Sequence, residues 1–261
     1  MSDCTYTLTI DCGNTSAKLA LWRSPAESCG GTSQPAGMPE CCRRICVRTL
    51  TAADIAGVCR DYNICRAIWC SVADDADTPS EALQLLQRLC PAVTVLTVDT
   101  PTPLTVGYTT PQTLGVDRLA AAVGAYSLAE CHGRDILVSD IGTAITYDHV
   151  SPAGQYEGGN IAPGIFMRLC ALHHYTARLP QTETDGPVPL WGYDTDTALR
   201  SGAINGVVAE LEFYRSRLGE DSAVVLTGGA AALIADRLSF RPTVIPDLVG
   251  LGLYFILHFN Q

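Results

Sequence analysis

A short motif places a carboxylate, a glycine and a hydroxyl between two hydrophobic segments. Asp140, Gly142 and Thr143 follow the aliphatic run 136–138, and the chain then returns as a second apolar segment. Glycine permits backbone angles that other residues resist, so neighbouring N–H groups can converge on one anion. A carboxylate repels a phosphate, but it can hold a metal ion that the phosphate also touches. The motif is typical either of a nucleotide-phosphate turn or of an ordinary hairpin with an Asp-x-Gly turn.

A second copy of this motif favours the phosphate turn. Asp11, Gly13 and Asn14 occur in the same order between the hydrophobic segments 8–10 and 17–20. The two aspartates are 140 − 11 = 129 residues apart, about half of the 261-residue chain. A repeat at half the chain length predicts a duplicated domain, with two equivalent hairpins that face each other across a nucleotide site.

Three further charged residues lie between the two turns in the sequence. Lys18 is the only lysine among the 17 basic residues, and it follows the first glycine turn, where an ammonium group suits a phosphate contact. Asp117 and Arg118 follow Gly115 and open an Ala-rich segment. Asp117 is either a carboxylate that an N-terminal helix turn favours, or a base presented to a substrate, with Arg118 placed to receive an anion.

The elements that must position these residues alternate in type, which predicts an α/β protein with mixed sheets. A loose loop is expected over residues 24–42 and a glycine turn or close ligand approach over 157–164, because both stretches are rich in turn-forming residues. The Thr-Gly-Gly stretch 227–229 should place backbone N–H groups at a helix start. The expected strands are 45–50, 66–72, 93–98 and 223–226. One helix is expected to begin at Thr51, and the other expected helices cover 79–90, 119–130, 166–179, 196–217 and 251–259.

Composition argues against several classes of protein. The net charge is −10 and there is no long basic run, so a nucleic-acid partner is not expected. No apolar run approaches the roughly 18 residues of a membrane helix, and the first residues lack a signal-peptide pattern, so we expect a cytoplasmic protein. The 12 cysteines are expected to be reduced thiols, since a chain of this length builds a core without disulfides.

The order of the motifs resembles a known superfamily. The Asp-x-Gly turns at Asp11 and Asp140, followed by Thr-Gly-Gly at Thr227, are similar to the acetate kinase, sugar kinase, Hsp70 and actin superfamily. The resemblance implies a duplicated ribonuclease-H-like fold, also called the actin-like ATPase fold. Two α/β domains with mixed sheets, here residues 1–114 and 115–261, would surround a nucleotide cleft.

Other motifs make the resemblance more specific. The segment 108–118 with its Gly-Val-Asp-Arg end, the run 158–164 and the run 248–252 look like those of the type III pantothenate kinases. The match covers nearly the whole chain. It implies phosphorylation of the terminal hydroxyl of pantothenate by ATP, the first step of coenzyme A synthesis, by a homodimer.

The resemblance also implies roles for individual residues. Asp117 would be the catalytic base, Asp140 would hold a monovalent cation, K⁺ or NH₄⁺, and Asp11 would lie near Mg²⁺. The ATP-binding residues would be Asp11, Cys12, Gly13, Asn14, Thr15, Ser16, Ala17, Lys18 and Thr143. The pantothenate-binding residues would be Tyr108, Gly115, Val116, Asp117, Arg118 and Thr197. The family usually has Asn at the position of Asp196, where this chain adds a negative charge near an anionic ligand.

Two alternatives to a pantothenate kinase stay open. One is a different small-molecule kinase of the same superfamily, and the other is a regulatory protein that keeps the fold without the activity. A silent relative should have lost at least one functional group, yet Asp11, Asp117, Asp140 and Thr143 are all present. A substrate screen with ATP separates the two kinase readings.

Overall fold

Packing divides the chain into two compact units. The computed structural model describes residues 6–23, 38–71 and 80–260. Unit 1 holds the described residues up to 128 together with 154–156 and 247–260, and unit 2 holds 129–153 and 157–246. This division differs from the expected boundary after residue 114, because the helix after that boundary and the C-terminal helix both pack with the first sheet.

Unit 1 is built on a mixed sheet with the strand order β3-β2-β1-β4-β5 among the described residues. Strand β1 pairs antiparallel with β2 and parallel with β4, while β3 is antiparallel to β2 and β5 is parallel to β4. The strands span Tyr6–Cys12 (β1), Ala17–Arg23 (β2), Glu40–Val47 (β3), Ile64–Ser71 (β4) and Val93–Val95 (β5). Strand β3 begins inside the stretch expected to be a loop, and residues 24–37 of that stretch lie outside the described residues.

Two helices cover one face of this sheet. Helix α1 (Ala52–Asp61) begins at Thr51 as predicted, because Thr51 and Asp54 form a capping box that satisfies backbone N–H groups at the helix start. Helix α2 (Glu81–Leu89) is amphipathic and turns its apolar side to the same core. The core between them includes Leu8, Ile10, Ile55, Val58, Leu83 and Leu86.

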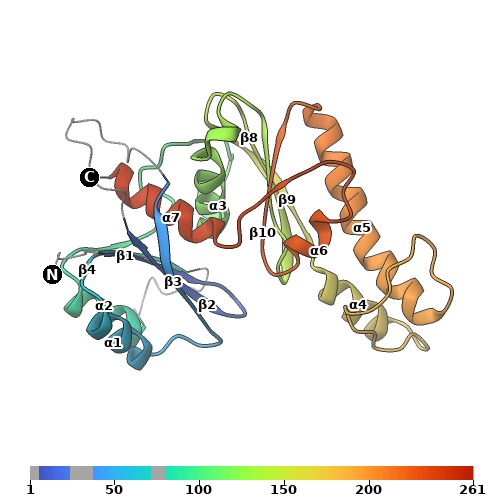
Figure 1. Cartoon of the computed structure of the whole chain (residues 1–261), viewed down its shortest axis with the longest axis horizontal. Coiled ribbons are helices and arrows are strands. Elements are labelled where there is room, and N and C mark those ends of the chain that lie inside the picture. The colour runs from blue at the N-terminus through green and yellow to red at the C-terminus, as the bar shows by residue number, and fades with distance from the viewer. Residues whose placement is uncertain (1–5, 24–37, 72–79, 261) are drawn as a thin grey trace. The chain divides into compact units, whose positions relative to one another are not determined.

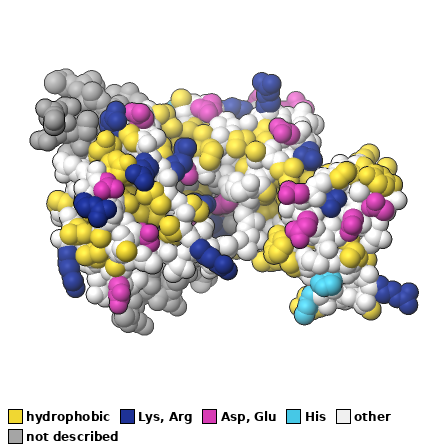
Figure 2. Space-filling model, turned by 60° about the horizontal axis from the view of Figure 1, so that its bottom comes forward, with side chains coloured by type: hydrophobic (Ala, Val, Ile, Leu, Met, Phe, Trp, Pro, Cys, Tyr) yellow, Lys and Arg dark blue, Asp and Glu magenta, His cyan; other side chains and the backbone are white. Residues whose placement is uncertain are grey.

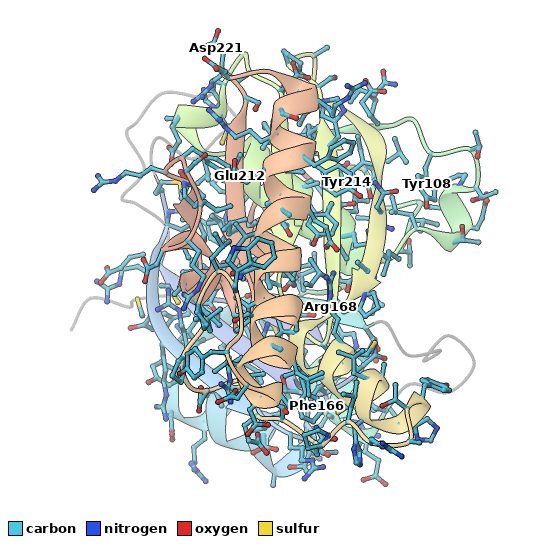
Figure 3. The ribbon with its side chains drawn as sticks, turned by 90° about the vertical axis from the view of Figure 1, so that its right-hand side faces the viewer. Tyr108, Phe166, Arg168, Glu212, Tyr214 and Asp221 are labelled. Carbon is cyan, nitrogen blue, oxygen red and sulfur yellow. The ribbon has the colours of Figure 1, made fainter. Side chains whose placement is uncertain are left out.

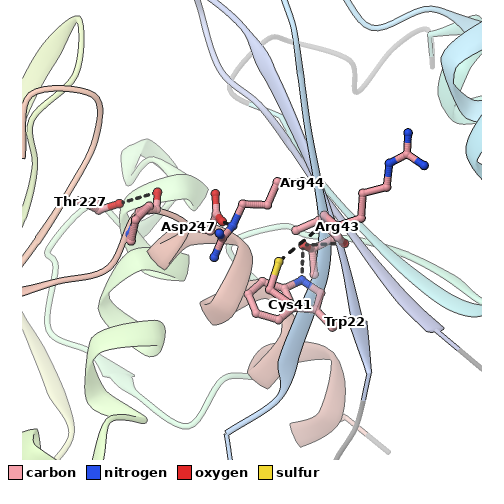
Figure 4. A network of polar contacts seen from close by, with 9 residues as sticks. Trp22, Cys41, Arg43, Arg44, Thr227 and Asp247 are labelled. Atoms are coloured by element: carbon pink, nitrogen blue, oxygen red, sulfur yellow. Dashed lines mark hydrogen bonds and ion pairs between the residues drawn. The ribbon is translucent and has the colours of Figure 1, made fainter.

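Helix α7 (Leu248–Phe259) contacts β1, β2 and β4 of the sheet, and helix α3 (Val116–Tyr126) packs against α7 (Figure 1). The two helices cross so closely that a Cβ on Gly252 would overlap the carbonyl oxygen of Ala120. Arg44 of β3 forms an ion pair with Asp247 at the start of α7 (Figure 4). The glycine at the crossing brings α7 close to α3, and the ion pair links the start of α7 to β3 of the sheet.

Unit 2 repeats the central arrangement of unit 1. Strand β7 pairs antiparallel with β8 and parallel with β10, and β11 is parallel to β10. The full sheet has the order β11-β10-β7-β8-β9-β6, and its β6 end pairs with the first residues of β9, which are grouped with unit 1. The strands span Thr105–Val106 (β6), Ile136–Asp140 (β7), Ala144–Val150 (β8), Gln155–Pro163 (β9), Ala223–Thr227 (β10) and Thr243–Val244 (β11).

The helices of unit 2 are α4 (Ile165–Tyr175), α5 (Thr195–Leu218) and α6 (Ala231–Ala235), and they bury one face of its sheet over an aliphatic core (Figure 1). Of the two alternatives for 157–164, the plain turn is wrong, because the residues up to Pro163 belong to β9 and Gly164 is the N-cap of α4. Short 3₁₀ turns cover Pro111–Thr113 and Ala129–Cys131.

The strand pattern confirms the α/β class with mixed sheets. In each unit, a central strand with an aspartate among its last two residues has an antiparallel hairpin partner on one side and a parallel strand on the other. This is what a duplicated domain predicts. Within the described residues, no helix combines the length and the hydropathy that crossing a bilayer requires.

The crossing of α3 and α7 gives a first prediction. Gly252→Ala should destabilise the protein, because the new methyl group would overlap the backbone of Ala120. Overpacking of this kind costs about 1–3 kcal/mol, which urea denaturation would show as a fall in the free energy of unfolding. Gly57→Ala in α1 is the control, since a Cβ there meets nothing within 4 Å. Equal stability of Gly252→Ala and wild type would contradict the close crossing.

Candidate functional site

In unit 1, strand pairing gathers several predicted residues on one face of the sheet. Asp11, at the end of β1, lies opposite Lys18 of β2 and opposite Cys70 of β4. Side chains directly opposite each other in neighbouring strands point to the same face. This face is the one packed against α7, because Thr9, two residues before Asp11, lies beside Gly250. The lone lysine and the first aspartate are therefore neighbours.

The turn that joins Asp11 to Lys18 is short and open to solvent. The N–H of Gly13 donates to the carbonyl oxygen of Ser16 at 3.1 Å and closes the turn. Gly13, Asn14 and Thr15 are exposed, whereas Ala17 is buried and Cys12 and Ser16 are half-buried. The exposed residues of the predicted ATP-binding segment therefore lie at its tip, and its ends are anchored in the sheet.

Asp117 lies in the first turn of α3, where its carboxylate folds back over the helix start. The backbone N–H of Arg118 donates to Asp117 Oδ1 at 2.8 Å. A Cβ on Gly115 would come within 2.5 Å of the same oxygen. Glycine at the N-cap thus leaves the space that the Asp117 carboxylate occupies. Val116 is half-buried and Arg118 is buried, so this part of the predicted pantothenate site lies against the body of unit 1.

Cys70 lies opposite Asp11 and within electrostatic reach of Asp117. Burial raises the pKa of its thiol well above the usual range, and the negative charges of Asp11 and then Asp117 raise that pKa further. Both carboxylates are therefore close enough to act on the same sulfur atom. A thiol in this environment stays protonated and adds no third negative charge.

In unit 2, the second hairpin is fastened to the Thr-Gly-Gly turn. Asp140 lies opposite Thr227, the last residue of β10, and the N–H of Ile141 donates to the Thr227 carbonyl at 2.8 Å. The N–H of Ala230 donates back to the Ile141 carbonyl at 3.1 Å. Gly228 has φ +91°, and a Cβ there would overlap Asp140 Oδ1 and the Ile141 carbonyl. Only glycine fits this backbone without strain.

Thr143 is exposed at the tip of the same hairpin. The N–H of Gly164 donates to its carbonyl oxygen at 3.0 Å, and a Cβ on Gly164 would overlap the carbonyl oxygens of Gly142 and Thr143. The start of α4 therefore rests directly against the backbone of the hairpin tip.

The remaining predicted substrate residues have local partners. Tyr108 follows β6 and packs edge-on against Tyr156, with ring centroids 6.2 Å apart. Thr197 belongs to the capping box of α5, where its hydroxyl donates to Asp194 Oδ1 at 2.7 Å. Asp196, in the first turn of α5, accepts a hydrogen bond of 2.9 Å from the buried hydroxyl of Thr182, which lies in the loop before this helix.

The oxygen atoms of the protein suit cations whose coordination sphere is completed by a bound ligand. Among the described residues, no group of three or more His, Cys, Asp or Glu side chains could hold a metal by itself. Mg²⁺ commonly takes one or two carboxylates plus substrate phosphates, which suits Asp11 with Asp117 nearby. Asp140 Oδ1 and the Ile141 carbonyl oxygen both lie within 2.6 Å of the position that a Cβ on Gly228 would take, and oxygen donors are those that a hard cation prefers.

Several residues of these two clusters could not be singled out from the sequence. Cys70 lies opposite Asp11 only through the register of β1 and β4, which no local pattern encodes. Gly164 had a signal in the glycine-rich run 158–164, although its role against Thr143 needed the structure. Gly228 had a signal in the Thr-Gly-Gly motif. The sequence did not show that the N–H of Ala230, at the start of α6, donates to the hairpin backbone at Ile141.

A family model described as type III pantothenate kinase matches residues 7–217 of this chain. A Bacteroides fragilis protein named type III pantothenate kinase is 38% identical over 261 residues, covering 97% of this chain and 98% of its own. A Porphyromonas gingivalis protein of the same name is 36% identical over 263 residues, covering 98% and 99%. The chain belongs to the type III pantothenate kinase family.

Solved structures agree with the fold expected for type III pantothenate kinases. A Campylobacter jejuni protein described as a Baf family transcriptional activator has a TM-score of 0.61 at 20% identity, covering 97% of this chain and 98% of its own. A Sinorhizobium meliloti protein described as a 2-dehydro-3-deoxygalactonokinase has a TM-score of 0.58 at 13% identity, covering 98% and 99%. These likenesses show the fold alone, which is the actin-like ATPase fold of sugar kinases.

The environment of Cys70 gives a second prediction. Because the thiolate is the reactive form and the pKa of Cys70 is raised, Cys70 should resist alkylation in the folded protein at about pH 8. Cys46, exposed on β3 of the same sheet, is the internal control and should react. Mass spectrometry after iodoacetamide treatment would measure both, and both should react once the protein is denatured. Equal labelling of the two thiols in the native protein would show that Cys70 is not enclosed as described.

Proposed function

We propose that this protein transfers the γ-phosphoryl group of ATP to the terminal hydroxyl of pantothenate, the first step of coenzyme A synthesis. The observation that carries the proposal is the strand pairing that sets Asp11 opposite Lys18 and Cys70, together with Asp117 in the first turn of α3 of the same unit. One carboxylate follows a glycine-turn strand and suits a metal ion, and the other opens a helix and suits a substrate hydroxyl. Membership of the family supplies the identity of the acceptor.

Asp117 is proposed as the base. A hydroxyl is a poor nucleophile until a carboxylate accepts or at least orients its proton, and catalysis of phosphoryl transfer rests mostly on positioning and charge stabilisation. Asp117 Oδ1 is held by the Arg118 N–H over the start of α3, and Gly115 leaves it room. The carboxylate is thereby kept in one orientation before a substrate arrives, which reduces the entropy lost in reaching the reactive geometry.

The phosphates are assigned to the glycine turns. Asp11 would hold Mg²⁺, which neutralises charge that develops on the phosphates, and Lys18 beside it would contribute a point charge. The other proposed ATP contacts in this hairpin are Cys12, Gly13, Asn14, Thr15, Ser16 and Ala17. Thr143 would contribute a hydroxyl from the hairpin of unit 2.

A monovalent cation, K⁺ or NH₄⁺, is proposed at Asp140. The carboxylate meets the Ile141 carbonyl where Gly228 lacks a side chain, so oxygen donors of two kinds converge there. A carboxylate near a triphosphate is repelled unless a cation intervenes. Tyr108, Gly115, Val116, Arg118 and Thr197 are the proposed pantothenate contacts.

The protein is proposed to be a cytoplasmic homodimer, and exposed apolar side chains support the dimer. Soluble monomers rarely expose many large apolar groups, and such groups commonly mark protein interfaces. Unit 2 exposes them in two segments, at α4 and in the loop before α5, and hydrophobic side chains are visible on the molecular surface in Figure 2. The residues concerned are Phe166, Met167, Tyr175, Leu190, Trp191 and Tyr193. A second copy of this chain is the occupant that the family resemblance implies.

Asp117→Asn should leave the fold and pantothenate binding largely intact but lower turnover, because asparagine keeps the shape without accepting the proton. General-base catalysis typically contributes on the order of 10²–10⁴ in rate, and we expect kcat to fall within that range. Steady-state ADP release measures it, and calorimetry measures pantothenate binding. Asp99→Asn, an exposed aspartate of the same unit, is the matched control. Turnover near the wild-type rate would exclude Asp117 as the base.

The same assay tests the substrate and the monovalent cation. ADP release should require pantothenate, and the rate should be higher in K⁺ or NH₄⁺ salts than in Na⁺ or Tris at equal ionic strength.

Gly228→Ala should abolish this salt preference, because its methyl group would overlap Asp140 and Ile141. Gly229→Ala is the control and should keep the preference, because a Cβ at Gly229 meets nothing within 4 Å. Turnover of another alcohol but not pantothenate would favour a different kinase of the superfamily. Equal rates in all salts would assign Asp140 another task.

A further inference from the structure

A network of charged and polar side chains joins three elements of unit 2. One nitrogen of Arg168 in α4, Nη2, donates to both carboxylate oxygens of Glu210 in α5, at 2.8 and 2.7 Å. The hydroxyl of Tyr147 in β8 donates to Glu210 Oε2 at 2.5 Å. The Arg168 side chain is 18% exposed, and Tyr147 is buried. Figure 3 shows Arg168 beside α5, close to the junction of β9 and α4.

Arg168 also forms hydrogen bonds with the residues that precede its own helix. Its Nε donates to the Pro163 carbonyl at 2.8 Å, and its backbone N–H donates to the Gly164 carbonyl at 2.9 Å. The N–H of Gly164 in turn donates to the Thr143 carbonyl at 3.0 Å. The guanidinium group thus binds Pro163, the neighbour of the glycine whose N–H donates to the Thr143 carbonyl at the hairpin tip.

These contacts form a closed circuit that begins and ends at the hairpin. From Thr143 the path runs through Gly164 and its neighbour Pro163 to the Arg168 guanidinium, from there to Glu210, and from Glu210 to Tyr147. Tyr147 lies on β8 only four residues after Thr143, so the peptide chain closes the ring. A ring of this kind restrains the hairpin tip from both sides, whereas a simple link between two helices would leave it unaffected.

The protonation of the network suits this task. Burial raises the pKa of Glu210, but hydrogen bonds from Arg168 and Tyr147 outweigh that effect and leave the pKa below its usual value. Burial, and then the Glu210 carboxylate, raise the pKa of Tyr147. Near neutral pH the carboxylate is therefore ionised and the phenol keeps the proton that it donates.

We infer that Arg168 and Glu210 are positioning residues for ATP, which hold the Thr143 hairpin in its phosphate-binding shape through the start of α4. The inference rests on the proposed ATP contact of Thr143. Neither side chain has to touch the nucleotide, since their effect reaches it through the backbone of Gly164 and Thr143. The alternative is an ordinary connection between α4 and α5 that affects stability alone.

The test measures ATP affinity by calorimetry without pantothenate, and the KM values for both substrates. In Arg168→Gln and in Glu210→Gln, we expect ATP affinity to fall about tenfold while the pantothenate KM changes less than about twofold. Because the two residues act as one unit, the double variant should lose little more than either single variant. Arg168→Lys keeps the charge but not the fork of donors, and it should be impaired in the same direction.

Two variants on α5 are the matched controls. Arg215→Gln removes a guanidinium that donates to the Glu220 carbonyl at 2.9 Å and stacks on Phe240, and Glu212→Gln alters a carboxylate that accepts from Ser239. Both should keep wild-type ATP affinity, whatever they do to the melting temperature.

Each outcome decides between the readings. A lower melting temperature with unchanged ATP affinity in the Arg168 and Glu210 variants would overturn the inference and leave an ordinary helix connection. A wild type that binds ATP without turning over pantothenate would overturn the proposed function, while a selective loss of ATP affinity in the variants would still support the inference. A wild type that does not bind ATP would overturn both.

Discussion

The register of two parallel strand pairs is the constraint on which both residue clusters depend. β1 with β4 sets Asp11 opposite Cys70, and β7 with β10 sets Asp140 opposite Thr227. A shift by one residue would turn each aspartate to the opposite face of its sheet, because side chains alternate along a strand. The antiparallel hairpin partner then fixes what lies on the other side, which for Asp11 is Lys18. The chemistry of each unit follows from this pairing.

Close backbone approach is the second requirement, and glycine meets it at the points that matter. Gly115 leaves space for the carboxylate of Asp117, and Gly164 lets the start of α4 rest on the tip of the second hairpin. Gly228 does the same between Asp140 and Ile141, in a conformation that other residues rarely adopt. These glycines weaken local structure slightly, yet they allow oxygen atoms and N–H groups to approach within bonding distance.

Negative charge dominates the candidate residues, and the structure limits it in two ways. Asp11 and Asp117 lie beside a thiol that stays neutral, so no third anion is added. Glu210 is ionised but balanced by Arg168, while Tyr147 keeps its proton. An acidic protein with carboxylates near its glycine turns needs cations to accept a polyphosphate, which is the physical reason for proposing Mg²⁺ and a monovalent ion.

The sequence by itself determined the local features and the family. The repeated Asp-x-Gly turns, the lone lysine and the capping of α1 by Thr51 are all written in neighbouring residues, where turn chemistry and helix capping act. Tertiary structure alone decided that β3 starts at Glu40, that the run before Gly164 is a strand, and that Arg168 meets Glu210. Those features depend on strand register and helix packing between residues far apart in the chain. Such pairings leave no local pattern, because their free energy arises only when the distant partners are already in place.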